Sequence, residues 1–154
     1  MIRAVPTLIV ALALAGLADA LYFTFAYYGR IKKARWVPAI LCAREGSSCF
    51  TVVQTPYARV LGVPNSVLGI LYYVSIMLWL PWPADVHGVE EHAYLFLLLT
   101  GALFLASAAT VVLGFYLIYA LRSKLRVHCP LCYTAHAINI SLFVLLIGFC
   151  HAVL

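Results

Sequence analysis

The chain has 154 residues, of which 66% are hydrophobic and only 10% are charged. This composition excludes a soluble globular domain, whose surface needs far more charge, and indicates an integral membrane protein. The formal net charge of +5 would suit nucleic-acid binding, but the basic residues flank apolar stretches. We therefore assign them to membrane topology and expect no nucleic-acid partner.

Four apolar stretches follow one another along the chain, and a helix needs about 20 residues to cross the hydrocarbon core of a bilayer. The predicted spans are residues 4–28, 64–82, 93–121 and 127–152. They predict an all-α membrane protein, a four-transmembrane-helix bundle, in a single integral membrane domain of residues 1–154. The third stretch exceeds what a bilayer requires, so we expect it to tilt, extend beyond the lipid, or be interrupted near Gly101 or Gly114.

The first stretch contains one charged residue, Asp19. Because a carboxylate is costly in contact with lipid, this side chain is expected to face the interior of the bundle. Its role there is either that of a hydrogen-bond partner or that of a proton relay, and the sequence does not choose between them.

Residues 29–63 form the longest polar segment and connect the first two predicted helices. The segment contains Cys42 and Cys49, separated by charged and small residues. Its second half is only moderately polar, so we expect it to lie as a short helix against the membrane or over the bundle. The predicted fold thus has a cysteine-bearing loop and short helix between its first two spans.

Lysine and arginine are distributed unevenly between the two faces that four crossings define. Of the ten such residues, all but Arg3 belong to the first and third connections, namely Arg30, Lys32, Lys33, Arg35, Arg44, Arg59, Arg122, Lys124 and Arg126. Basic residues beside membrane spans stay in the cytoplasm. This pattern predicts a multi-pass protein of the cell membrane whose cysteine-bearing face is cytoplasmic. Disulfides are rare in proteins exposed to the cytoplasm, and the intracellular proteins of hyperthermophiles are the exception.

Cys129 and Cys132 form a C-P-L-C sequence at the start of the last apolar stretch. Residues three apart are neighbours on one face of a helix, at a Cβ separation that a first turn can adjust to the geometry of a disulfide. Pro130 suits a first turn because that turn needs no backbone N–H from it. The helix amino terminus and the nearby Lys124, Arg126 or protonated His128 would lower the pKa of a thiol, as disulfide exchange requires.

Two other interpretations of the cysteines remain. They are either unreactive residues of an apolar helix or metal ligands, since four cysteines with His128 could bind zinc or copper(I). The spacing of Cys42 from Cys49 is looser than that of usual zinc sites. The alternative to an enzyme is therefore a non-enzymatic tetraspan protein that uses its cysteines to bind metal or as structural staples, whereas the redox interpretation needs no metal.

Taken together, these residues resemble the vitamin K epoxide reductase family. The resemblance rests on Cys42-x6-Cys49, Thr55, the Pro64-Asn65-Ser66 sequence and C-P-L-C followed by Ala137-Ile138-Asn139, and also on residues 16–22. It covers almost the whole chain and implies a four-helix bundle around a quinone, with a cysteine-bearing loop above it. Many prokaryotic members carry a further helix and a fused thioredoxin-like domain; this chain resembles a short homologue without them.

The resemblance also implies an electron relay that generates disulfides. Cys42 would accept electrons from a separate thioredoxin-like or DsbA-like redox protein, and Cys49 would exchange with Cys129. Cys132 would then pass the electrons to the quinone. Asn65 would donate a hydrogen bond to a quinone carbonyl, and Thr55 would hold a hydroxyl group near the loop cysteines.

His136 departs from the pattern of animal members, which commonly have a quinone-binding tyrosine at this place. Cys129, Cys132, His136 and Asn139 are expected on a single stripe of the last helix, because their spacings repeat every three or four residues. His136 could therefore donate to the second quinone carbonyl or deliver a proton. The difference favours a menaquinone- or ubiquinone-like respiratory quinone over vitamin K.

Overall fold

The computed structural model describes residues 4–30, 52–60, 62–81 and 90–153. The long helices are α1 (Ala4–Tyr27), α4 (Asn65–Trp79), α5 (Glu90–Tyr119) and α6 (Pro130–Val153). Between α1 and α4 lie a 3-10 turn, η1 (Pro56–Ala58), and the short strands β1 (Arg59–Val60) and β2 (Val63–Pro64). A π-helical segment, η4 (Ala120–Leu125), continues α5. The predicted all-α membrane bundle is confirmed.

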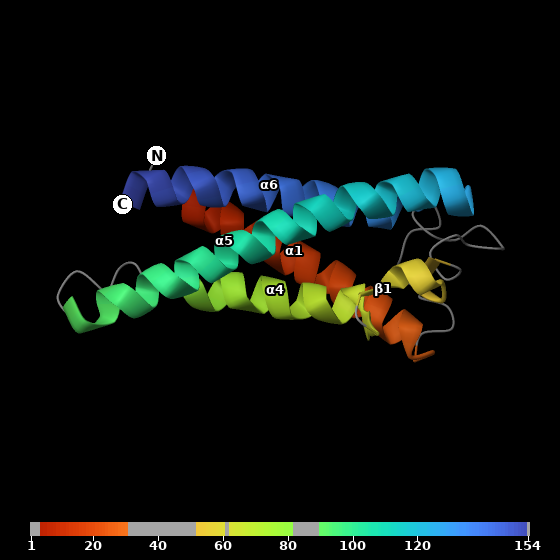
Figure 1. Ribbon diagram of the computed structural model, residues 1–154, viewed down its shortest axis with the longest axis horizontal. Coiled ribbons are helices and arrows are strands. Elements are labelled where there is room, and N and C mark those ends of the chain that lie inside the picture. The colour runs from red at the N-terminus through yellow and green to blue at the C-terminus, as the bar shows by residue number, and fades with distance from the viewer. Residues whose placement is uncertain (1–3, 31–51, 61, 82–89, 154) are drawn as a thin grey trace.

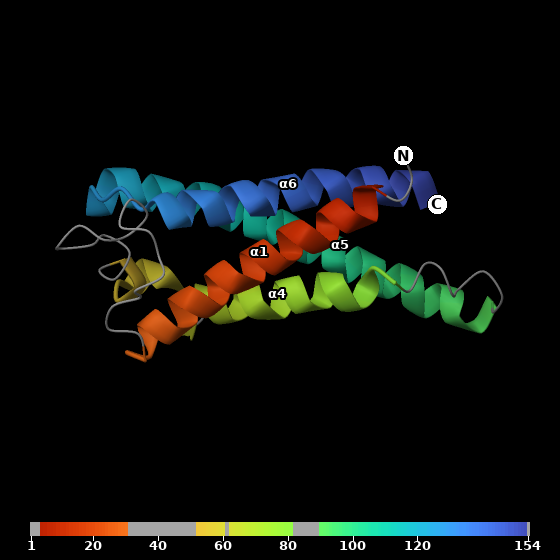
Figure 2. The same ribbon diagram turned by 180° about the vertical axis from the view of Figure 1, so that it is seen from behind.

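The four helices pack as a ring in which neighbours in sequence are antiparallel. α1 contacts α4 and α6, and α5 contacts the same two helices from the opposite side. The two views show α5 crossing one face of the bundle and α1 the other (Figures 1 and 2). The start of α1 and the end of α6 lie at one end of the bundle, and η1 and β1 lie at the other. The start of α6 is therefore at the same end as η1.

The helix lengths differ from the predicted spans in one respect. In the part of the chain that the structure describes, three helical stretches are long and apolar enough to cross a membrane, namely Val5–Tyr27, Tyr94–Leu125 and Pro130–His151. The second predicted span contains only the 15 residues of α4, fewer than the roughly 20 that a full crossing needs. The third span is one continuous helix through both glycines, so it is not interrupted and instead extends into η4.

The segment before α4 is a hairpin rather than the expected continuous short helix. Val52 and Val53 are helical, but Pro56 starts the separate turn η1. The strands β1 and β2 then pair antiparallel, and the chain reverses at Gly62, whose φ of 82° is easily reached only by a residue without Cβ. This hairpin lies over the start of the shortened α4 (Figure 1).

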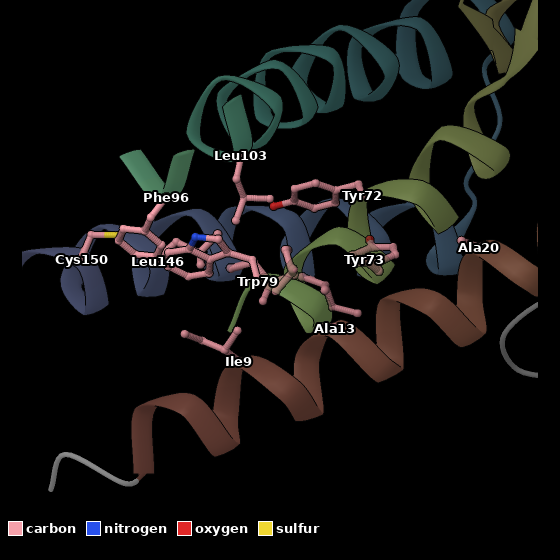
Figure 3. Packing of buried hydrophobic residues seen from close by; sticks show 13 residues of the cluster. Ile9, Ala13, Ala20, Tyr72, Tyr73, Trp79, Phe96, Leu103, Leu146 and Cys150 are labelled. Atoms are coloured by element: carbon pink, nitrogen blue, oxygen red, sulfur yellow. The ribbon is translucent and has the colours of Figure 1, made fainter. Parts of the chain in front are cut away.

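The packed interior is mostly apolar, with a few polar links between helices. Ile9, Ile76 and Leu142 are fully buried, and Figure 3 shows α1, α4, α5 and α6 contributing to this cluster. The indole Nε1 of Trp79 donates to Thr100 Oγ1 at 3.0 Å. Such bonds satisfy polar groups that would otherwise face hydrocarbon.

Candidate functional site

Cys129 and Cys132 form a close pair at the amino terminus of α6. Cys129 immediately precedes the helix and is fully buried, and Cys132 lies in the first turn. Their Sγ atoms are 2.6 Å apart, against about 2.05 Å in a disulfide. The predicted neighbourhood of these two sulfurs is confirmed, and bond formation between them needs only a small movement.

The local hydrogen bonds favour a thiolate at Cys129. The Cys132 side chain donates to Cys129 Sγ, and the backbone N–H of Cys132 donates to the same sulfur at 3.4 Å. These bonds, with a further backbone contribution from Leu131, lower the pKa of Cys129, although burial and the charge of Asp19 oppose them. The amino-terminal turn of the helix, as predicted, therefore makes Cys129 the sulfur that is easier to ionise.

A cavity of about 200 Å³ lies between the helices below the two cysteines. Its walls come from α1, α4, α5, η4, α6 and the segment around η1, and most of the lining side chains are apolar. Cys132 is part of the wall. The polar or ionisable groups that share the wall with it include Asp19, Asn65, Tyr73, His136 and Asn139. Mainly apolar walls with a few polar groups are typical of small-molecule sites.

Within the described residues, two polar atoms of this wall are buried without a hydrogen-bond partner, namely Asn65 Oδ1 and His136 Nδ1. Asn65 Nδ2 donates to the carbonyl oxygen of Tyr57 at 3.1 Å. Asn65 was expected to donate to a quinone carbonyl; one Nδ2 hydrogen is already engaged, which leaves the second hydrogen and the unpartnered Oδ1. The second Nδ2 hydrogen of Asn65 and a protonated Nδ1 of His136 can each donate to an oxygen, so these two side chains fit a ligand with two carbonyl oxygens, such as a quinone. Asn65 Oδ1 can accept only from a hydroxyl group, such as that of the reduced ring.

The predicted stripe is found for three of its four residues, because Cys129 precedes α6 and does not line the cavity. Cys132, His136 and Asn139 all line the cavity, one turn after another. Asn139 is already occupied, because its Oδ1 accepts a hydrogen bond of 2.7 Å from the hydroxyl group of Tyr73. His136 packs closely against α5 at Gly114, where an added Cβ would lie 2.9 Å from Nδ1. The absence of a side chain at Gly114 therefore provides space for the imidazole.

Tyr73 is a cavity residue that the sequence pattern did not single out as part of the site. It lines the cavity and is buried against α1, where the ring would overlap a Cβ added at Gly16. The available sequence signal was the spacing of Ser66, Gly69 and Tyr73, which places all three on the face of α4 that lines the cavity.

The remaining predicted site residues are Thr55, Cys42 and Cys49. Thr55 Oγ1 donates to the carbonyl oxygen of Val52 at 2.7 Å, and Thr55 is not among the residues that line the cavity. Cys42 and Cys49 lie outside the described residues, so the meeting of the two cysteine pairs stays a prediction. Within the described ranges no group of three or more metal-ligating side chains is found, but the metal hypothesis also uses Cys42 and Cys49.

Comparison with known proteins identifies a family for this chain. A family model described as the vitamin K epoxide reductase family matches residues 7–147, nearly the whole chain. The match includes both cysteine pairs and the polar residues of the cavity. A search of curated proteins found no match. The chain is a membrane protein that belongs to the vitamin K epoxide reductase family, whose members are quinone-associated oxidoreductases.

Proposed function

We propose that this protein is a quinone-dependent thiol oxidoreductase that generates disulfides in a partner protein. The observation that carries the proposal is the position of the sulfur pair. Cys129 and Cys132 are 2.6 Å apart, and Cys132 borders an apolar cavity with two unpartnered polar atoms. Electrons would run from a thioredoxin-like or DsbA-like protein through Cys42 and Cys49 to this pair and then to a membrane quinone.

The sulfur chemistry follows from the lowered pKa of Cys129. A thiolate at Cys49 would attack Cys129 Sγ of the oxidised pair, and Cys132 would leave as the free thiol. Cys42 would then attack Cys49 Sγ, and Cys129 would be the leaving group. Sulfurs of lower pKa leave faster in thiol–disulfide exchange, so the hydrogen bonds to Cys129 accelerate this second step. A quinone, when bound, would accept the two electrons and two protons of the reduced pair.

The cavity residues would orient the quinone ring. Asn65 would donate its second Nδ2 hydrogen to one carbonyl oxygen, and His136 would donate to the other from a protonated Nδ1. Most of the other lining residues are apolar and would exclude water from the ring. A menaquinone- or ubiquinone-like respiratory quinone is proposed, because His136 replaces the tyrosine of animal members.

The basic residues support an active site on the cytoplasmic side. Arg30, Arg59, Arg122, Lys124 and Arg126 are all exposed. They come from the segments at the end of the bundle that carries the cysteine pair. A membrane-impermeant maleimide applied to intact cells is expected to leave the thiols unlabelled until the membrane is opened. Labelling of these thiols in intact cells would show that the cysteine pair faces the outside, contrary to the proposed orientation.

Thiol counting tests the proposed activity. The purified protein is reduced, freed of reductant, mixed with a short-chain ubiquinone or with menadione, and alkylated with a reagent that adds mass. Quinone is expected to protect Cys129 and Cys132 from alkylation in the wild type, and Cys132→Ser is expected to lose quinone reduction. Cys150→Ala is the matched control, because Cys150 lies on the same helix but is buried in the apolar core of the bundle. If alkylation of the thiols does not change with quinone but is blocked by zinc or copper(I), the result would support the metal-binding alternative.

The order of the relay has its own test. Cys42→Ser is expected to block oxidation of a thioredoxin-fold protein while leaving turnover with a small dithiol intact. A small dithiol reaches the inner pair directly and does not need Cys42. Equal losses in both assays would contradict the assigned order.

A further inference from the structure

Asp19 is an ionisable residue of the cavity wall to which the proposed relay assigns no step. It lies on the face of α1 that also presents Gly16, Ala20 and Phe23 to the cavity. Within the described part of the chain, no hydrogen bond or ion pair to its carboxylate is found. A carboxylate in a membrane span is costly and marks a functional position by default. Helix packing does not explain this residue, because it forms no polar link between helices.

Asp19 lines the same cavity as Cys132, within electrostatic range of both sulfurs of the redox pair. Its charge interacts with the sulfurs of both Cys129 and Cys132. It also interacts with the hydroxyl groups of Tyr22, on its own helix, and of Tyr73, on α4. The other titratable groups of the wall are His136 on α6, Tyr72 on α4 and Tyr57 in η1. The lining residues of α5, which include Thr110, Leu113 and Gly114, contribute none.

Reduction of a quinone by a dithiol requires proton transfer as well as electron transfer. Two S–H bonds break, one S–S bond forms, and two carbonyl oxygens each gain a proton to give the hydroquinone. The protons start at the sulfur pair and end on ring oxygens inside a cavity whose walls are largely apolar, so few wall groups can carry a proton between them. Tyr73 is a poor carrier, because its hydroxyl proton is donated to Asn139.

On the basis of the proposed function, we propose that Asp19 is the proton-transfer residue between the Cys129–Cys132 pair and the quinone. The Asp19 carboxylate accepts the proton of the Cys132 thiol as the S–S bond forms, and the carboxylic acid then donates that proton to a quinone oxygen. The second proton is released to water by the other thiol and replaced from water at the second oxygen. Asp19 ends unchanged, the sulfur pair loses two electrons, and the quinone gains them.

The test compares Asp19→Asn with Asp19→Glu in the full-length protein in nanodiscs. Asparagine keeps the size and polarity of the side chain but cannot carry the proton, whereas glutamate can. With the protein reduced and mixed with a short-chain ubiquinone, single-turnover oxidation is expected to slow about 100-fold in Asp19→Asn, the usual lower range for loss of an acid–base group. Asp19→Glu is expected to stay within about tenfold of wild type, and its pH–rate profile is expected to shift because the carboxyl group differs.

Two readouts separate proton transfer from a structural role. Reduction of the Cys129–Cys132 disulfide by dithiothreitol does not use the quinone, so Asp19→Asn is expected to change its rate far less than it slows quinone reduction, through the loss of the Asp19 charge alone. Binding of the ubiquinone is expected to be unchanged. A wild-type oxidation rate and pH profile in Asp19→Asn would overturn the inference, and so would an unshifted profile in Asp19→Glu if the asparagine variant fails to fold. A wild-type protein that does not reduce quinone at all would instead refute the proposed function.

Discussion

Replacing Gly114 by alanine tests whether the cavity beside Cys132 is the quinone site. A Cβ added at Gly114 would lie 2.9 Å from His136 Nδ1 and 3.3 Å from His136 Cγ. Ordinary contacts begin near 3.4 Å, so the imidazole must move by about 0.5 Å, the difference between 3.4 and 2.9 Å. The ring is held against α5, and this movement displaces Nδ1 from the position in which it would meet a quinone oxygen.

The expected magnitude follows from one weakened hydrogen bond. Loss of such a bond costs about 1 kcal/mol, which corresponds to about a fivefold rise in the quinone KM. Overpacking in a well-packed interior costs about 1–3 kcal/mol, and the gain of about 1 kcal/mol from replacing a helical glycine by alanine offsets part of it. The net loss of stability is therefore small, and the effect on KM is measurable in a folded protein.

Gly101→Ala is the matched control for this experiment. Gly101 lies on the same helix, and an added Cβ would meet nothing within 4 Å. The alanine variant is expected to keep the wild-type KM and to gain a little stability. Steady-state quinone reduction with a small dithiol measures both variants. Equal KM values for Gly114→Ala and Gly101→Ala would show that the quinone does not depend on His136 in this cavity.

Two further predictions concern helix packing and the thiolate. Gly16→Ala is expected to lower the free energy of unfolding by about 1–3 kcal/mol, because its Cβ would overlap the Tyr73 ring. Thermal unfolding measures this loss. Gly148→Ala is the control and should show no such loss, because its Cβ would meet nothing within 4 Å. Because hydrogen bonds from Cys132 lower the pKa of Cys129, thiolate absorbance is expected to persist below the pH at which an ordinary cysteine is protonated. Cys132→Ala removes the side-chain donor and should move this titration to higher pH, and an unchanged curve would contradict the assigned cause.

The sequence by itself determined the helices and the arrangement of residues along each one. Hydrophobic length predicted the long helices, although it overestimated the second one. The three-residue spacing of Cys129 and Cys132 predicted that they are neighbours, and their sulfurs lie 2.6 Å apart. The spacing of Cys129, Cys132, His136 and Asn139 predicted a single stripe, and the last three of these residues line the cavity. These predictions succeed because helical rise and rotation are local properties, set by the backbone and independent of the partners of the helix.

Only the tertiary structure decided which faces of the other helices meet the cavity. In a membrane the outer face of a helix is as apolar as its inner face, so hydrophobicity does not indicate how the helix is rotated. Leu105, Val112 and Phe115 of α5 are exposed, whereas Gly114 on the same helix contacts His136. Three features of the site depend on contacts between segments distant in sequence. They are the place of Tyr73 in the cavity wall, the surroundings of Asn65 Oδ1 and the position of Asp19 on the same wall as Cys132. Those contacts exist only after the bundle has packed.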